Sequence, residues 1–388
     1  MKILFLSWNY PPARGGIERL VENLFHALSA RHEVRLLTAH AGGAPDEPGV
    51  ERAPKPGIAA YLWFVFRRGW SLCRADRPDV ILCGTVVPAP VAVLLRWRFG
   101  VPFVVPTYGS DILREGWLYQ MAFRWLLRRA ATVVAVSGQT RNLLAKRGFD
   151  PAAIRVIYPG VKAADFDRRP AAIAPELEAM VSGRKVVLTV GRLIRRKGVL
   201  EFVEGVMPQL CRDRPDVLYL VVGDDAKASL VHHERLRDRI AARVGELGLD
   251  SHVRLLGSLS DADLLALYFR SHVFVLPCLD IPGDVEGFGI VFLEAALAGM
   301  PSAATRVGGI PEAVEDGVTG LIVPPGDPAA MCNAVERLLS DDTLRSRMAA
   351  AGADRARRAF GWPAIASRYE KVLEAAVARA AGRLDRPA

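Results

Sequence analysis

The residues with the clearest chemical potential lie between positions 286 and 301. Glu286 and Glu294 are eight positions apart, Gly287 and Gly289 follow the first of them, and an apolar run separates the two carboxylates. If a helix begins near Gly289, eight helical residues rise roughly 12 Å, so both carboxylates can hardly act on one atom. They suit the two ends of an extended ligand.

The expected start of this helix is also a candidate anion site. The backbone amides of Phe288, Gly289 and Ile290 would point out of the helix N-terminus, and glycines let a phosphate approach the backbone closely. In this arrangement the two carboxylates would bind hydroxyls at the two ends of a ligand, and the amides would bind phosphates between them. A nucleoside-diphosphate sugar has these groups in this order. The alternative is a buried helix with a glycine-rich leading loop and two unrelated surface glutamates, and this segment alone does not decide.

A second motif, residues 191–198, directly follows a predicted strand and is bracketed by glycines. Arg192 can bind one phosphate through two hydrogen bonds, while Lys197 supplies a point charge to another. This pair therefore suits a diphosphate. The neighbouring Arg195 and Arg196 can be plain solvated charges.

The composition indicates a globular protein of two domains. Of 388 residues, 51% are apolar and 24% charged, and a chain of this length exceeds one compact core. The five cysteines are widely spaced and form no C-x-x-C pair, which predicts neither a disulfide frame nor a zinc site. The N-terminal apolar run is too short for a signal peptide and the run 58–66 too short to span a bilayer, so we expect a cytoplasmic protein.

The net charge of +9 lies entirely within residues 1–180, while residues 181–388 are neutral overall. The first half is therefore the one expected to face something anionic. Within it, segments 59–74 and 117–129 interleave aromatic rings with arginines, which suits peripheral binding to the anionic inner face of a membrane. The alternative is helices whose rings pack inward and whose arginines are solvated. No nucleic-acid binding motif accompanies the charge, so we expect no nucleic-acid partner.

Apolar runs and helical segments alternate along the whole chain, which predicts an α/β protein with parallel sheets. We expect two similar doubly wound, Rossmann-like domains with a cleft between them. The predicted organisation is a first domain at 1–168, a linker at 169–184, a second domain at 185–362 and a C-terminal helix at 363–388 that can pack across both. The predicted strands are 2–7, 33–38, 79–83, 102–106, 132–136, 186–190, 217–222, 252–256, 273–276 and 321–323, and the main predicted helices are 17–28, 199–212, 233–247, 261–269 and 329–339.

Taken together, the motifs resemble glycosyltransferase family 4, a group of retaining, nucleotide-sugar-dependent enzymes with the GT-B fold. The resemblance rests on Gly191-Arg192…Lys197-Gly198, on Glu286-Gly-Phe-Gly…Glu294, and on Gly308-Gly309-Ile-Pro-Glu312. The segments Pro11-Pro12…Gly15-Gly16 and Ile157-Tyr-Pro-Gly160 also match its pattern. The match extends over nearly the whole chain, with the segments in the family's order.

The resemblance implies roles for individual residues. Arg192 and Lys197 would hold the diphosphate and stabilise the charge that develops as it leaves. Glu286 would bind hydroxyls of the transferred sugar, and Glu294 the ribose. Gly16 would let the backbone of the first domain meet the phosphates.

One departure concerns Tyr108-Gly109-Ser110-Asp111, where the family commonly has His-Gly-x-Asp. The family's histidine is thought to assist the sugar hydroxyls; Tyr108 can donate a hydrogen bond there but cannot carry a proton at neutral pH. We keep Tyr108 as a catalytic-site candidate. The family is generally metal-independent, so we expect no metal and no cofactor, with a UDP- or GDP-sugar as donor.

The predicted function is retaining transfer of a hexose from a nucleoside diphosphate to an acceptor hydroxyl in glycan or glycolipid biosynthesis, with a lipid-linked or membrane-proximal acceptor. One alternative is a nucleotide-sugar epimerase or phosphorylase on the same fold, since fold does not fix function. Another is a non-catalytic binding protein that uses the basic first half. The sequence leaves open the sugar, the base, the acceptor, the linkage and the oligomeric state.

Overall fold

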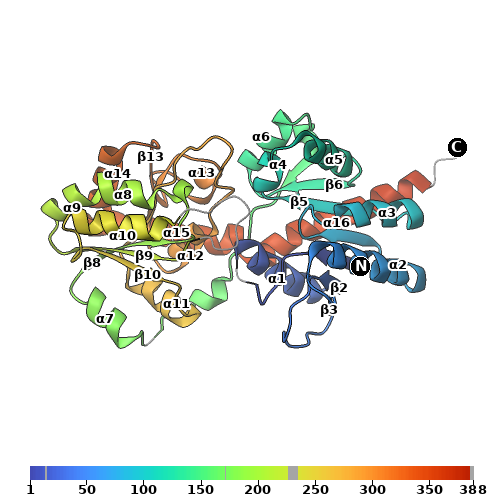
Figure 1. The fold of residues 1–388 in the computed structure, drawn as a ribbon, viewed down its shortest axis with the longest axis horizontal. Helices are drawn as coiled ribbons and strands as arrows, with labels where there is room; N and C mark the ends of the chain where they lie inside the picture. The colour runs from blue at the N-terminus through green and yellow to red at the C-terminus, as the bar shows by residue number, and fades with distance from the viewer. Residues whose placement is uncertain (14, 171, 226–234, 385–388) are drawn as a thin grey trace. The chain divides into compact units, whose positions relative to one another are not determined.

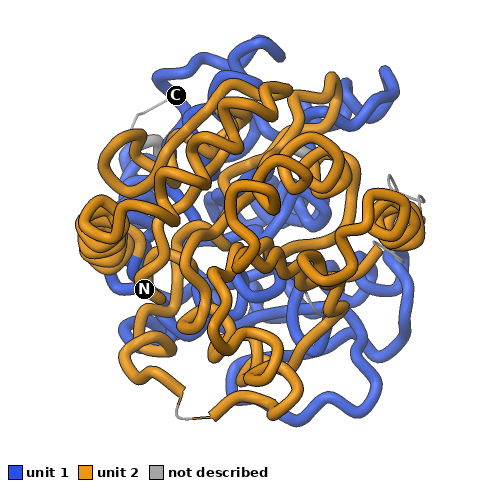
Figure 2. The backbone as a smooth tube through the Cα atoms, turned by 90° about the vertical axis from the view of Figure 1, so that its left-hand side faces the viewer, with its two compact units in different colours: residues 1–160, 361–388 blue, residues 161–360 orange. Residues whose placement is uncertain are grey.

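The computed structural model divides into two compact units, shown in different colours in Figure 2. Unit 1 comprises residues 1–160 and 361–388, and unit 2 comprises residues 161–360. Each unit is built on one parallel β-sheet with helices on both faces (Figure 1). The expected class of two doubly wound, Rossmann-like α/β domains is confirmed. The structure describes residues 1–13, 15–170, 172–225 and 235–384.

The sheet of unit 1 has seven parallel strands. Most are short apolar runs buried on both faces, as strands of parallel sheets usually are. The register sets Phe5 beside Leu36 on one side and Leu82 on the other. Across the sheet the strands are β3 (Val50–Arg52), β2 (Glu33–Thr38), β1 (Lys2–Ser7), β4 (Val80–Cys83), β5 (Phe103–Thr107), β6 (Thr132–Ala135) and β7 (Ile154–Val156).

Successive residues of a strand point to opposite faces of the sheet, so these apolar strands present apolar side chains on both faces. Helices cover both faces and bury these side chains. Leu4 and Leu6 face the core under α2 (Ile58–Ala75), α3 (Ala89–Phe99), α5 (Trp117–Leu127) and α6 (Gly138–Lys146). Ile3 and Phe5 face the core under α1 (Gly16–Ser29) and α16 (Trp362–Leu384), which brings the C-terminal helix into unit 1. The remaining short helices are α4 (Ser110–Leu113) and η1 (Pro151–Ala153).

The sheet of unit 2 has six parallel strands, and their order repeats the pattern of unit 1. In both sheets the first strand of the unit lies between its second and fourth strands, as in dinucleotide-binding folds. Across the sheet the strands are β10 (Val253–Gly257), β9 (Val217–Val222), β8 (Lys185–Val190), β11 (Val273–Leu276), β12 (Ser302–Thr305) and β13 (Gly320–Val323).

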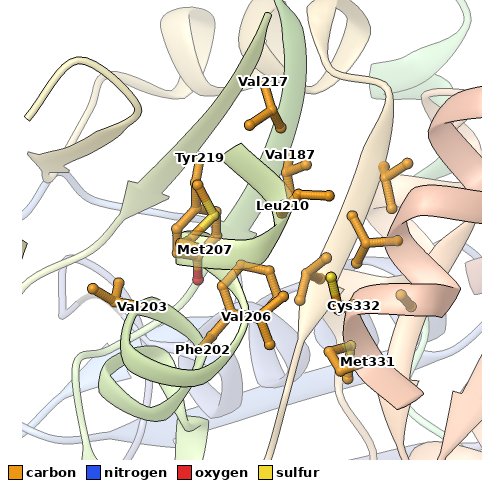
Figure 3. Packing of buried hydrophobic residues seen from close by; sticks show 14 of the residues in the cluster. Val187, Phe202, Val203, Val206, Met207, Leu210, Val217, Tyr219, Met331 and Cys332 are labelled. Atoms are coloured by element: carbon orange, nitrogen blue, oxygen red, sulfur yellow. The ribbon is translucent and has the colours of Figure 1, made fainter. Parts of the chain in front are cut away.

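Figure 3 shows the core on one face of this sheet, where Phe202, Met207 and Leu210 pack against Val187 and Tyr219. The predicted helix 199–212 is two helices there, since a new one starts at Met207 with a proline in its first turn. On the other face, Phe274 packs edge-on against Phe292, with ring centroids 5.4 Å apart. The helices are α7 (Pro175–Val181), α8 (Val199–Gly205), α9 (Met207–Asp213), α10 (Leu236–Glu246), α11 (Asp261–Arg270), α12 (Ile290–Leu297), α13 (Ile310–Ala313), α14 (Pro328–Ser340), α15 (Asp342–Phe360), η2 (Ala163–Phe166) and η3 (Arg195–Lys197).

The boundaries of the units differ from those drawn from the sequence. Residues 161–168, expected in the first domain, lie in unit 2, because Phe166 packs against the rings of Tyr268 and Phe269 at 6.1 Å. The expected linker 169–184 contains α7, and Trp362 packs in the core of unit 1. Within the described residues, no helix combines the length and the hydropathy that crossing a bilayer requires.

Candidate functional site

The strand order of unit 2 changes direction at β8, which lies between β9 and β11. Ligands of such sheets bind beyond the carboxyl ends of the strands at this point. Two loops meet there, residues 191–198 after β8 and the loop after β11: the amide of Leu279 donates to the carbonyl of Arg196 at 2.8 Å. Gly198 has φ +68°, and a Cβ on it would lie 2.0 Å from the carbonyl oxygen of Pro277. Only glycine allows this approach.

Four charged side chains meet between these loops, and we call them the unit 2 charge cluster: Arg196, Lys197, Asp284 and Glu286. The Lys197 ammonium donates to Oε2 of the buried Glu286 at 2.7 Å. The Arg196 guanidinium donates to the same oxygen, and its Nε donates to Oδ1 of Asp284 at 2.8 Å. Lys197 and Glu286, which were both predicted to bind the donor, therefore lie in direct contact.

The interpretation of Arg196 as a solvated charge is wrong. Its side chain is only 9% exposed, because the loop after β11 folds over it and supplies two carboxylates. Asp284 was likewise missed. Their pairing joins positions 88 residues apart, and no local pattern in the sequence indicates it.

The electrostatics of the cluster fix its protonation. Burial alone would raise the pKa of Glu286, but the charges of Lys197 and Arg196 outweigh burial and lower that pKa to about 2. Burial opposes the charge on Arg196, yet Glu286 and Asp284 raise its pKa above the ordinary value. Burial raises the pKa of the neighbouring Cys278 thiol to about 12. At neutral pH, Glu286 is therefore an ionised hydrogen-bond acceptor beside a neutral thiol.

The Gly308-Gly309 turn fixes the backbone of Glu286. The amide of Gly309 donates to the carbonyl of Glu286 at 2.9 Å. A Cβ on Gly308 would lie 2.2 Å from that same carbonyl oxygen. The turn therefore belongs to this site.

Helix α12 carries the other predicted donor residues of unit 2. It begins at Ile290, with Gly289 as its N-cap, so its first amides have no helical carbonyl to bond. Phe288 and Gly289 are buried. Glu294 lies in the second turn, where its carboxylate accepts a hydrogen bond of 2.9 Å from the Tyr268 hydroxyl. Arg192, by contrast, is exposed.

The two predicted site residues of unit 1 lie at the carboxyl edge of its own sheet. Gly16 is the exposed first residue of α1, after the loop that follows β1. Tyr108 follows β5, and its hydroxyl donates to the carbonyl of Gly84, after β4, at 2.9 Å. Burial raises the pKa of Tyr108 well above its ordinary value, so the phenol remains a neutral donor.

Asp111, three residues after Tyr108, is a second carboxylate withdrawn from water. Burial raises its pKa to about 6, and a backbone hydrogen bond with Tyr108 lowers it only in part. Among the described residues, its Oδ2 atom is buried and has no hydrogen-bond partner.

The acidic pair Asp224-Asp225 has a structural role. Asp225 accepts the amides of Leu236 and Arg237 at the start of α10, both at 3.1 Å, and Asp224 pairs with the Arg237 guanidinium at 3.0 Å. Across the part of the chain that the structure describes, no three His, Cys, Asp or Glu side chains are placed to hold a metal ion.

A family model described as Glycosyltransferase Family 4 matches residues 14–165, and one described as Glycosyl transferases group 1 matches residues 175–355. A GDP-mannose-dependent α-(1-6)-phosphatidylinositol monomannoside mannosyltransferase from Mycolicibacterium smegmatis is 30% identical, over 96% of this chain and 98% of that protein. Glycogen synthase from Mycobacterium tuberculosis is 29% identical, over 97% of this chain and 95% of that protein.

Solved structures share the fold. HepE from Anabaena, in complex with UDP, aligns with a TM-score of 0.77 at 23% identity, over 96% of this chain and all of that one. Sucrose-phosphate synthase from Thermosynechococcus elongatus aligns with a TM-score of 0.79 at 25% identity, over 97% of this chain and 99% of that one. From its two sheets, its family models and these relatives, the chain belongs to glycosyltransferase family 4 and is a glycosyltransferase of the GT-B fold.

Proposed function

We propose that the protein transfers a hexose from a nucleoside diphosphate to a hydroxyl of a lipid-linked or membrane-proximal acceptor, with retention at the anomeric carbon. The observation that carries the proposal is the ionised Glu286, paired with Lys197 where the strand order of unit 2 reverses. The relative from M. smegmatis supports both substrate classes, since its name specifies GDP-mannose and a phosphatidylinositol-linked acceptor.

Each residue of the donor site has a proposed role. The exposed Arg192 and the Lys197 ammonium bind the diphosphate, and the backbone amides of Phe288, Gly289 and Ile290 are assigned to the same phosphates. Glu286 accepts hydrogen bonds from hydroxyls of the transferred sugar. Glu294, on the second turn of α12, accepts hydrogen bonds from the ribose. In unit 1, Gly16 is assigned to the phosphates, and Tyr108 is assigned to the hydroxyls of the transferred sugar.

The protonation of Glu286 constrains the reaction. A carboxylate whose pKa is about 2 is a weak base and a weak nucleophile, so it does not suit attack on the anomeric carbon. We therefore assign front-face substitution without a glycosyl-enzyme intermediate. The bond from the anomeric carbon to the β-phosphate oxygen breaks, and the bond to the acceptor oxygen forms. The acceptor proton passes to the departing phosphate, which leaves as part of the nucleoside diphosphate.

Metal independence is part of the proposal. Positive charge for the leaving diphosphate is available from Arg192 and Lys197, and helix N-termini add oriented amide dipoles. These groups perform the electrostatic task that divalent cations perform in other transferases.

Thermal unfolding with UDP, GDP, ADP and their hexose conjugates, with and without EDTA, tests the donor site. We expect one nucleotide to raise the melting temperature equally in both conditions. With the donor identified, NMR of the product's anomeric proton tests retention. Loss of the shift in EDTA would contradict metal independence, and an inverted product would contradict front-face substitution. No shift with any nucleotide would remove the assigned donor site.

A further inference from the structure

The exposed apolar side chains of the protein are concentrated on three helices of unit 1. Among the described residues, nine large apolar side chains are exposed, and eight of them lie on α2, α3 and α5. Four are tryptophans: Trp63 is 64% exposed, Trp97 83%, Trp117 71% and Trp125 49%. An exposed apolar group of this size on a soluble domain usually marks an interaction surface. The other four residues are Ile58, Leu94, Leu118 and Met121.

These helices form one continuous layer. All three pack on the same face of the unit 1 sheet, and α3 contacts both α2 and α5 (Figure 1). Trp70 of α2 packs edge-on against Phe99 of α3, with ring centroids 4.9 Å apart. The Arg96 guanidinium of α3 donates to the carbonyl of Arg129, just beyond α5. We call this layer the aromatic face.

On α5 the spacing directs the rings outward together. Trp117, Met121 and Trp125 are four residues apart, so they form a stripe along one side of the helix. Phe123 and Leu127 turn to the core on its other side. The predicted alternative, in which the rings pack inward, is therefore wrong for Trp117 and Trp125, although it holds for the buried Tyr61 of α2.

The exposed charge of the aromatic face is mainly basic, although Arg68 pairs with Glu51 at 2.5 Å and the exposed Glu115 lies just before α5. The sequences of α2, α3 and α5 contain six arginines and neither Asp nor Glu, and two more arginines directly follow α5. Arg124, Arg128 and Arg129 are exposed, and the Arg129 guanidinium lies 3.7 Å from the ring centre of Trp125. The helices on the opposite face, α1 and α16, mix glutamates with their basic residues.

We infer that the aromatic face is a docking surface for an anionic lipid bilayer. Tryptophan rings favour the interfacial region of a bilayer, and exposed arginines such as Arg124, Arg128 and Arg129 are attracted to anionic headgroups. A mainly basic surface with ring side chains turned outward suits this partner, and its charge complementarity favours an anionic lipid surface. The inference deepens the proposed function by placing the acceptor at a membrane, and it is tested without turnover.

Cosedimentation of the full chain with vesicles tests the inference. We expect binding to vesicles of phosphatidylcholine mixed with phosphatidylglycerol, weaker binding to pure phosphatidylcholine, and release by salt. The double variants Trp117→Ser/Trp125→Ser and Arg124→Ser/Arg128→Ser should each reduce partition into anionic vesicles by about tenfold or more. Val318→Ser and Arg337→Ser, at an exposed apolar residue and an exposed arginine of unit 2, serve as controls and should bind like the wild type.

The outcomes separate this inference from the proposed function. A cooperative thermal unfolding transition, measured without vesicles or nucleotide, confirms that each variant is folded, and the shift of that transition by the nucleotide reports separately on unit 2. Failure of the folded wild type to bind anionic vesicles at low salt, or wild-type binding by both double variants, would overturn the inference whatever the nucleotide result. Equal binding to pure phosphatidylcholine would overturn the role of the arginines.

Discussion

Glu286 in unit 2 and Asp111 in unit 1 are both carboxylates withdrawn from water beyond a strand of a parallel sheet, yet their pKa values move in opposite directions. Burial raises the pKa of both. For Glu286 the charges of Lys197 and Arg196 reverse this effect and bring the pKa to about 2. Among the described residues, the one group that lowers the pKa of Asp111 is a backbone hydrogen bond with Tyr108, so this pKa stays at about 6. Burial acts on both carboxylates in the same direction, so the difference between their pKa values comes from the cations beside Glu286.

The difference also distinguishes the two edges chemically. The edge of unit 2 presents fixed charges, which suit a substrate with a diphosphate. The edge of unit 1 presents neutral donors such as Tyr108 and a carboxylate that can gain a proton in mild acid, which suits a substrate with hydroxyls. Variants at both edges test this contrast.

Glu286→Gln removes the anion from the unit 2 charge cluster while keeping the shape of the side chain. We expect kcat to fall by about 100-fold or more, since a group assigned to the sugar in the transition state is lost. Affinity for the nucleoside diphosphate should stay within about threefold, because the phosphates are assigned to other groups. Steady-state kinetics and titration calorimetry measure the two effects. Glu204→Gln, at an exposed carboxylate of the same unit, is the control, and wild-type turnover in Glu286→Gln would remove the assigned role.

The same variant should change how stability depends on pH. The folded-state pKa of Glu286, about 2, lies below its ordinary value of 4.5. The ionised carboxylate therefore stabilises the fold above pH 4.5, by on the order of 3 kcal/mol, and this contribution is lost as pH falls toward 2. The difference in melting temperature between wild type and Glu286→Gln should shrink across that interval. A difference that stays constant down to pH 2 would contradict the low pKa.

Arg196→Gln tests whether Arg196 positions Glu286. We expect kcat to fall by about tenfold with little change in nucleotide affinity, because the carboxylate keeps Lys197 but loses one of its two cations. Arg196→Lys should recover part of the loss. Lysine restores the positive charge, but it lacks the planar guanidinium that donates to Asp284 and Glu286 at the same time. Partial recovery by lysine separates positioning from a purely structural role. Equal losses in both variants, accompanied by equal loss of thermal stability, would favour the structural role.

Asp111→Asn tests the opposite case in unit 1. The folded-state pKa of about 6 lies above the ordinary value of 3.8, so the contribution of Asp111 to stability is most favourable below pH 3.8 and is lost as pH rises through 6. The uncharged variant should therefore be more stable than the wild type above pH 6, by about 3 kcal/mol, and should match the wild type in stability below pH 3.8. Thermal unfolding across this range measures the difference. A variant that melts lower above pH 6 would show that the carboxylate has a cation partner.

Tyr108→Phe should have the smallest effect. It leaves the carbonyl of Gly84 without the phenol donor, which costs about 1 kcal/mol. Denaturant unfolding measures this loss, and Tyr10→Phe, which removes a phenol bonded to the carboxylate of Glu47, is a matched control in unit 1. If transfer in Tyr108→Phe falls by more than about tenfold while stability changes little, the phenol acts on the substrate itself.

Strands with a strong local signal were predictable. Apolar runs such as 2–7 and 217–222 match β1 and β9 with the same limits, because a strand buried on both faces needs little but apolar residues. β12, Ser302–Thr305, was missed because Ser-Ala-Ala-Thr is short and carries little apolar surface. It forms a strand because it pairs with β11 on one side and β13 on the other. These pairings join segments that are distant in sequence, so the residues of β12 and their near neighbours do not reveal them.

Residues of the site that belong to recognisable motifs could be predicted. Lys197 and Glu286 were found in this way, and in the structure they form a hydrogen bond. Arg196 could not be assigned, since whether an arginine in a loop is solvated or buried depends on what folds over it. Helix α15 shows a different limit: its core residues Leu344, Met348, Gly352 and Ala356 recur every four positions. That signal was present, but the charged and alanine-rich sequence around it obscured the pattern.

The path of the chain between the units has an evolutionary consequence. The chain leaves unit 1 after Gly160 and returns at Gly361. At this crossing the amide of Val161 bonds to the carbonyl of Phe360 at 2.8 Å. The first and last residues of unit 2 are thus neighbours, and unit 2 is, in topology, an insertion into unit 1. Recombination at these two neighbouring points would exchange the whole of unit 2 for another domain while leaving unit 1 continuous.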